Sequence, residues 1–294
     1  MHRLDDSHEL PETPDDARES QYTGVIQNPW RRLREFTDAR IGLGRTGISL
    51  PTNELLAFQL AHARAKDAVH MSLDICTLRN QLRGVQGLPH AIAPYHLKSQ
   101  ANNRAVYLQR PDLGRQLDPL SLHILVHNPA TSHNSRHLAI VIIDGLSAQA
   151  VQLNTAPFLQ ALCGELIEDS QTDWQLNSVC IVEQGRVAIA DDIGERMGAD
   201  AVLVLIGERP GLSSPDSLGL YLTWGPRKGM NDAARNCISN IRPAGQSYSE
   251  AAQRTLYLLQ EAQRLGLSGV KLKDRSESKV IDHQQHNSSN FLTN

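Results

Sequence analysis

The apolar run at residues 202–206 constrains the fold of this 294-residue chain more than any other segment. It reads VLVLI, and three of its five side chains are β-branched. Such a run predicts a strand that is buried on both faces, as in a parallel sheet covered by helices. In those sheets ligands bind beyond the carboxyl ends of the strands. Glu208 and Arg209 follow at this place as an acceptor and a donor for a ligand, although an isolated pair of this kind more often forms a surface ion pair.

Strands and helices alternate over residues 106–274. Further strands are predicted at 138–143, 179–182, 186–189 and 218–224, and helices after Ser147, over 191–197 and from Ser247 to Gly266. Ser247 and Glu250 form a capping box, and Gly266 is typical of a helix end. The alternation predicts the α/β class, as a Rossmann-like three-layer domain with a mostly parallel sheet.

The region at 22–105 is predicted to be a small helical N-terminal domain. Asn28-Pro29 is a helix start signal, and an Ala-rich helix follows from Thr52 to Val69. Leu56, Leu60 and Ala63 lie on one face of that helix. Residues 1–21, which are acidic and almost without apolar side chains, and residues 275–294 are predicted to be disordered tails.

Composition excludes several classes of function. With 29 basic and 32 acidic residues the net charge is −3, and no basic block suggests a nucleic-acid partner. The mean hydropathy is −0.36, and the longest apolar run, 138–143, is too short to span a membrane. No signal segment opens the chain, and the four cysteines lack metal-site spacing. We expect a cytoplasmic protein without a membrane partner, a zinc site or disulfides.

Two motifs match binding sites only superficially. Gly42-x-Gly44-x-x-Gly47 has the dinucleotide pattern, but the polar sequence before it is not a buried strand, so a turn between helices is the better interpretation. Four histidines fall close together: His123, His127, His133 and His137. His123 and His127 would share a helix face, but no glutamate lies between them and Asn128-Pro129 breaks the chain just after them, so we interpret the four histidines as a solvated connection rather than a metal site.

Asp144 follows the predicted strand at 138–143. A carboxylate there could be catalytic, or it could cap the next helix through Gly145-Leu146-Ser147, which we favour. The nucleophile elbow G-x-S-x-G is absent from the sequence. No constellation of residues therefore predicts catalytic groups in this chain.

Six sequence words together resemble the small subunit of ethanolamine ammonia-lyase. They occur in the order of that family, within residues 22–274: SLPTNELLAFQLAHARAKDAVH (49–70), YLQRPDLGRQL (107–117), DGLSA (144–148), GRVAI (185–189), LIGERPGLSSPDSLG (205–219) and NCISNIRP (236–243). Six words in order are far more specific than one.

The resemblance implies an adenosylcobalamin-dependent enzyme that converts ethanolamine to acetaldehyde and ammonia by radical chemistry. In this family a large barrel subunit holds the substrate, and the small subunit completes the cobalamin site. The helical N-terminal segment packs on the large subunit. Carried over by motif, the cofactor-binding residues are Val187 in GRV, Glu208 in GER and Cys237 in NCISN. No catalytic residue or metal ligand of this chain is implied.

Two absences refine this expectation. The chain lacks a D-x-H-x-x-G word, which supplies a histidine to cobalt in some other cobalamin proteins, so we expect the cofactor to stay base-on. Residues 1–20 contain two prolines and no apolar stripe, so a bacterial microcompartment is less favoured than the free cytosol. The alternative functions are a stand-alone doubly wound oxidoreductase that uses the Gly42 region, and a scaffold protein.

Overall fold

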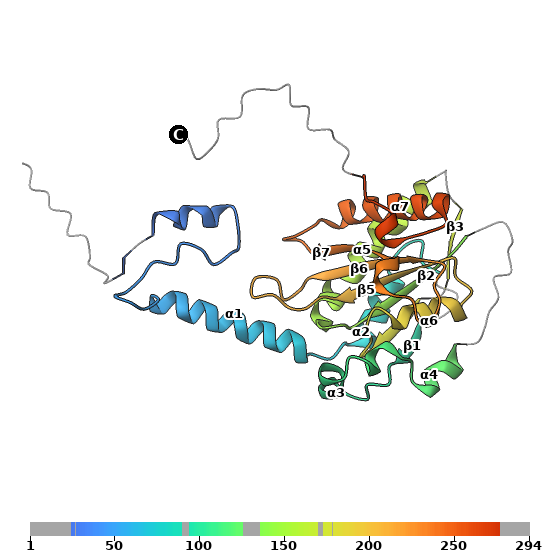
Figure 1. Ribbon diagram of the computed structural model, residues 1–294, viewed down its shortest axis with the longest axis horizontal. Coiled ribbons are helices and arrows are strands. Elements are labelled where there is room, and N and C mark those ends of the chain that lie inside the picture. The colour runs from blue at the N-terminus through green and yellow to red at the C-terminus, as the bar shows by residue number, and fades with distance from the viewer. Residues whose placement is uncertain are drawn as a thin grey trace, which may run out of the picture. The chain divides into compact units, whose positions relative to one another are not determined.

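The computed structural model describes residues 25–26, 28–89, 94–125, 136–169, 173–177 and 179–276. Contacts within the chain group it into two compact units, Met1–Leu60 and Ala61–Asn294 (Figure 1). None of the helices in these described ranges combines the length and the apolar character that crossing a bilayer requires.

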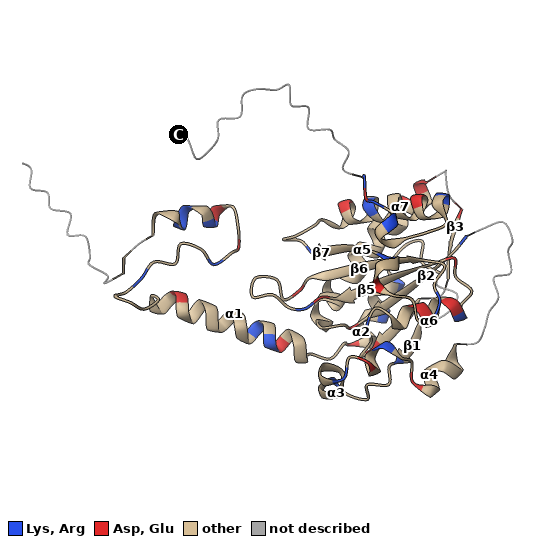
Figure 2. Cartoon of the chain, in the orientation of Figure 1, with Lys and Arg blue, Asp and Glu red and all other residues tan. Residues whose placement is uncertain are grey.

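The first unit contains the 3-10 helix η1 (Pro29–Glu35) and the first half of α1 (Thr52–His70). The predicted start at Asn28 is confirmed, since its side chain accepts a hydrogen bond from the Trp30 N–H at 3.0 Å. Leu56 and Leu60 of α1 are 59% and 52% exposed. Figure 2 shows no charged residue on α1 between Glu54, near its start, and its C-terminal half.

The second unit is built on a seven-stranded mixed sheet. Its order is β1-β4-β2-β5-β6-β7, and β3 also pairs with β2. The strands are β1 (Tyr95–Lys98), β2 (Arg136–Ile143), β3 (Trp174–Leu176), β4 (Cys180–Glu183), β5 (Ala201–Gly207), β6 (Leu218–Trp224) and β7 (Arg235–Ile241). The first five strands pair in parallel, whereas β6 runs antiparallel to both β5 and β7. The predicted α/β class is confirmed, and the antiparallel β6 makes the sheet mixed.

Helices cover both faces of this sheet (Figure 1). Besides the second half of α1, the α-helices of the second unit are α2 (Ile75–Arg83), α3 (Arg104–Gln109), α4 (Pro119–Ile124), α5 (Ala148–Glu168), α6 (Ile189–Arg196) and α7 (Tyr248–Leu265). This unit also has the short 3-10 helices η2 (Leu113–Arg115), η3 (Asp232–Ala234) and η4 (Gly269–Lys271). α2, α5 and α7 bury their apolar sides in the larger core on one face. α6 packs over β2 and β5 on the other face, where the smaller core lies. The predicted capping box of α7 and its end at Gly266, with φ of 65°, are confirmed.

The predicted strand at 186–189 is wrong. The N–H groups of Ile189 and Ala190 donate to the carbonyls of Arg186 and Val187 at 3.0 and 3.1 Å, so the chain turns directly into α6. The four-residue apolar alternation was too short to distinguish a strand from a helix start. Ile189 and Ile193, which are both fully buried, are spaced four residues apart, as on one helix face.

Three strands were not predicted. β1 lies within the region expected to be helical, and only one of its four residues is buried. β3 has no buried residue, and β7 has three buried residues among polar ones. Each of these strands has too few apolar side chains for the sequence pattern to indicate it.

Candidate functional site

The carboxyl edge of the sheet brings together the polar groups that follow β2, β4 and β5. Ile143, Val182 and Ile206 are neighbours in register, so Asp144, Gln184 and Glu208 follow at the same edge. β6 begins at this edge and β7 ends there, because Leu218 pairs with both Gly207 and Ile241. The loop between β5 and β6 is closed by the Glu208 N–H, which donates to the Ser217 carbonyl at 3.0 Å.

The Glu208 carboxylate ties three strands together at this edge. It accepts hydrogen bonds from the hydroxyl of Ser217, from the Ser239 hydroxyl at 2.6 Å and from the Asn240 N–H at 3.2 Å. These partners precede β6 or lie at the end of β7. In the described part of the chain, the partners of Glu208 are thus these groups and not Arg209, so the simple surface ion pair is not what forms.

Gly219 allows the Glu208 side chain to lie across β6. A Cβ atom at Gly219 would be 2.8 Å from Glu208 Oε1 and 2.9 Å from its Cγ. Real Cβ atoms essentially never approach so closely, so any other residue here would displace the carboxylate. The glycine is therefore part of the geometry that lets Glu208 reach β7.

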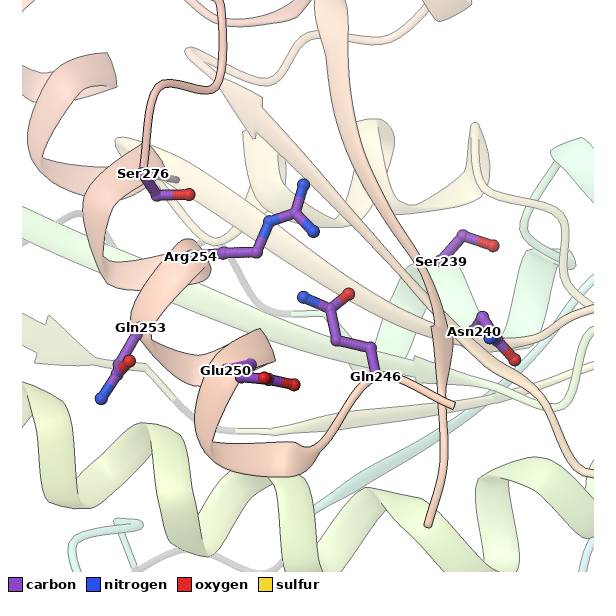
Figure 3. Close-up of a pocket in the computed structure, with 7 residues that line it drawn as sticks. All are labelled: Ser239, Asn240, Gln246, Glu250, Gln253, Arg254 and Ser276. Carbon is purple, nitrogen blue, oxygen red and sulfur yellow. The ribbon is translucent and has the colours of Figure 1, made fainter. Parts of the chain in front are cut away.

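Cys237 faces Tyr221 across β6 and β7, where the two residues are in register. Burial raises the pKa of both the Tyr221 hydroxyl and the Cys237 thiol, so both stay protonated at neutral pH. Ile238 belongs to the larger core, so Cys237 and Ser239 point to the opposite face. Figure 3 shows the Ser239 side chain turned away from α7. We call Glu208, Gly219, Tyr221, Cys237 and Ser239 the Glu208 face.

The structure places the three predicted cofactor residues on the α6 side of the sheet. Glu208 and Cys237 both border Tyr221, on which the Glu208 charge acts electrostatically. Val187 packs, like Tyr221, against the smaller core. Because α6 packs over β2 and β5, it leaves Cys237 and Ser239 exposed on the outer strand β7. Ser217, Gly219 and Ser239 were missed; Ser239 follows from Cys237 by strand alternation once β7 is known.

Arg235 fixes the start of β7 to α6. Its guanidinium donates to Asp191 Oδ2 at 2.5 Å, and both side chains are only 1% exposed. It also donates to the Asn231 carbonyl at 2.7 Å. A buried, paired charge of this kind sets the position of the strand on which Cys237 lies.

The segment before Val187 is held by a stack of aromatic and cationic groups. The Arg186 and Arg104 guanidinium carbons lie 4.2 and 4.9 Å from the centre of the Tyr107 ring. The Tyr107 hydroxyl donates to the Gly185 carbonyl at 3.1 Å. The backbone next to Val187 is thus anchored to α3.

Asp144 does not cap α5, contrary to the interpretation that we favoured. Ser147 is the cap, since its hydroxyl oxygen accepts from the Ala150 N–H at 3.1 Å. Asp144 is 2% exposed, and its Oδ2 lies 3.7 Å from an Arg104 nitrogen. Burial raises the pKa of Asp144 to about 6, against the opposing effects of backbone N–H groups and Arg104. The carboxyl is enclosed rather than open to a substrate.

The two superficially matching motifs have ordinary surroundings. Gly42, Gly44 and Gly47 all have positive φ, of 60°, 76° and 60°, in the segment between η1 and α1. His123 lies in α4 and His137 in β2, whereas His127 and His133 lie outside the described residues. Within the described ranges no group of three or more His, Cys, Asp or Glu side chains could hold a metal ion.

A polar pocket of about 530 Å³ lies between β7 and α7 (Figure 3). It is lined by Ser239, Asn240, Gln246, Glu250, Gln253, Arg254 and Ser276. Glu250 accepts from Ser247 in the capping box, and Arg254 pairs with Asp274 at 2.7 Å. These charged groups serve the structure of α7 and its C-terminal neighbour, so the pocket does not define the site.

Comparison with known proteins assigns the family. The family described as "Ethanolamine ammonia-lyase light chain (EutC)" matches residues 27–273. The ethanolamine ammonia-lyase small subunit of Pseudomonas aeruginosa is 53% identical over 266 residues, which are 90% of this chain and 94% of that protein. That of Azotobacter vinelandii is 52% identical over 275 residues, 93% and 98% of the two chains. The chain therefore belongs to the family of ethanolamine ammonia-lyase light chains.

Proposed function

We propose that this chain is the small subunit of an adenosylcobalamin-dependent ethanolamine ammonia-lyase, which converts ethanolamine to acetaldehyde and ammonia. The observation that carries the proposal is the Glu208 face, an open, polar part of the sheet at the carboxyl edge, in a chain whose relatives are named small subunits of this enzyme. The word small in those names implies a larger partner subunit. In this proposal the second unit serves as a Rossmann-like cofactor-binding domain.

The residues present fit a large ligand with many amide groups. Glu208 is held rigidly by three donors and Cys237 is exposed beside it, so acceptors are fixed at an accessible surface. In the proposal Glu208 and Cys237 bind the polar rim of the cofactor, and Val187 supplies an apolar contact. Bound adenosylcobalamin supplies the radical chemistry of the reaction, while this chain binds and orients it. No metal ligand is assigned to the chain.

This division of labour agrees with the chemistry of the groups in this chain. The Cys237 thiol stays protonated, and the Asp144 carboxyl is buried beneath the edge. Neither is suited to act on a small amine such as ethanolamine. The proposal therefore assigns the substrate site and the catalytic residues to the large subunit.

The N-terminal unit supplies a surface for that subunit in the proposal. Leu55, Leu56, Phe58 and Leu60 are all at least 42% exposed on α1, and the charges of the helix lie outside this stretch. Leu56 and Leu60 lie one helical turn apart on α1, and exposed apolar side chains on one helix face are typical of a protein interface. Burial of these side chains against the large subunit would stabilise the complex.

Two finer points belong to the same proposal. The cofactor is proposed to keep its own base on cobalt, because the sequence has no D-x-H-x-x-G word. The cytoplasm remains the proposed location. The Gly42 region, which lies in a loop and not after a strand, gives no support to the alternative of a nucleotide-dependent oxidoreductase.

Reconstitution tests the function directly. This chain alone, with adenosylcobalamin and ethanolamine, should form no acetaldehyde, and addition of the large subunit should start the reaction. The large subunit alone serves as the control and should have lost cobalamin affinity and turnover. Acetaldehyde formation by this chain alone would contradict the assignment of the catalytic residues to the large subunit. Full turnover by the large subunit alone would mean that this chain acts only as a scaffold.

A further inference from the structure

On the Glu208 face the serine hydroxyl protons point toward the Glu208 carboxylate and not toward solvent. An ionised carboxylate accepts hydrogen bonds and has none to donate, so the hydroxyls of Ser217 and Ser239 must be the donors in their contacts with Glu208. Each of these oxygens therefore keeps its lone pairs for a further partner.

Exposure decides which of these acceptors can meet a ligand. Ser217 is only 5% exposed, whereas Ser239 and Cys237 are exposed and Glu208 is half-buried. Two nearby cations are already engaged. Arg235 pairs with Asp191, and Arg242 donates to Asn240 Oδ1 at 2.8 Å. The accessible side chains of the Glu208 face are thus hydrogen-bond acceptors, whereas Arg209, the exposed neighbour of Glu208 in the sequence, is a cation outside this face.

We propose that Ser239 is a further ligand-binding residue and that Ser239 and Glu208 together select a hydrogen-bond donor of the class of a primary carboxamide. This inference rests on the proposed function, because cobalamin carries carboxamides around its rim. Glu208 has two parts in it: it accepts from the ligand, and it orients the Ser239 hydroxyl so that the oxygen faces outward. A carboxylate in place of the carboxamide would meet an array of acceptors and a negative charge.

The test compares cobalamin with derivatives in which one peripheral carboxamide at a time is hydrolysed to a carboxylate. Dissociation constants are measured by titration into the assembled complex of this chain and the large subunit. One derivative should bind roughly 10- to 100-fold more weakly than the others, as expected for loss of a hydrogen bond to a charged group. In a Glu208→Gln complex the same derivative should regain most of this loss, because the glutamine amide can donate to it.

Variants at position 239 give the second arm. Ser239→Ala should weaken binding of intact cobalamin about 2- to 10-fold, whereas Ser239→Thr, which keeps the hydroxyl, should restore it. Ser249→Ala, at an exposed serine of α7, is the matched control and should change nothing. Light scattering verifies that each complex has assembled.

The outcomes separate this inference from the proposed function. A wild-type complex that binds no cobalamin would refute the proposed function itself. If cobalamin binds and all hydrolysed derivatives bind equally well, the carboxamide assignment is wrong while the proposed function stands. Unchanged affinity in an assembled Ser239→Ala complex would remove Ser239 from the site.

Discussion

Replacement of Arg235 by methionine should destabilise the second unit by about 3–5 kcal/mol at pH 7.5, the usual cost of breaking a buried ion pair. Arg235 and Asp191 are each 1% exposed and lie 2.5 Å apart, so the variant leaves a buried carboxylate without its cation. Methionine keeps an unbranched apolar stem but lacks the guanidinium, so the lost charge and hydrogen bonds dominate the effect.

Replacement of Asp191 should destabilise the second unit less than replacement of Arg235. Asp191→Asn leaves Arg235 with the carbonyls of Asn231 and Met230, at 2.7 and 3.3 Å, and with Asp232 at 3.7 Å. We therefore expect a smaller loss of about 1–3 kcal/mol. The double variant Arg235→Met/Asp191→Leu has neither charge and should be more stable than Arg235→Met alone.

The cost of Arg235→Met should also depend on pH. Burial raises the pKa of Asp191 to about 6 even beside Arg235, and removal of the guanidinium raises it further. A carboxyl whose pKa is higher in the folded than in the unfolded chain contributes stability that is present at low pH and lost as the pH rises. The deficit of the variant should therefore shrink by about 1–2 kcal/mol between pH 7.5 and 5.5.

Urea unfolding followed by tryptophan fluorescence measures these free energies. Trp174 and Trp224 pack edge to face with ring centres 6.1 Å apart, so their emission reports on the sheet. A double variant that is no more stable than Arg235→Met alone would refute the coupling. A deficit that is equal at the two pH values would refute the buried, unpaired carboxylate as its cause.

Two further predictions concern the carboxyl edge. Burial raises the pKa of Asp144 to about 6, so the wild type loses stability relative to Asp144→Asn as the pH rises from about 4 to 7. That change should be about 2 kcal/mol in urea unfolding, and a difference that does not vary with pH would contradict it. Gly219→Ala should displace the Glu208 carboxylate and weaken cobalamin binding by the assembled complex, whereas Gly164→Ala, where a Cβ meets nothing within 4 Å, should not. Equal titration curves for these two variants would show that Glu208 does not need the glycine.

The sequence predicted those elements that carry a strong apolar pattern. β5 and β6 are indicated because their side chains are almost all apolar, and α7 because its cap, its apolar periodicity and its terminal glycine agree. The segment at 186–189 shows the opposite case. Its apolar residues do alternate, but Ile189 is the first residue of α6 and belongs to the buried face of that helix.

The candidate site was predictable only in part. Motifs pointed to Val187, Glu208 and Cys237, but the partners of Glu208 depend on β6 running antiparallel and on the register of β7. Ser217 and Ser239 are 22 residues apart in the sequence, and only that register brings both hydroxyls to one carboxylate. No local pattern in the sequence predicts that these two hydroxyls contact the same carboxylate.

Because β6 runs antiparallel to β5, the loop between them can vary in length while Glu208 and Ser217 at its two ends stay in contact. Residues 209–216 join two adjacent antiparallel strands without a crossover helix. The carbonyls of Pro215 and Asp216 accept hydrogen bonds from Ser147, the cap of α5, and from Asn154 of α5, each at 2.7 Å, so only residues 209–214 can change in length without moving a helix. The entropic cost of closing a longer loop rises only slowly with length. Glu208 and Ser217, at the two ends of this loop, would keep their pairing while the residues between them are remodelled. This edge is therefore a place where the shape around a ligand can be redesigned at little expense to the core.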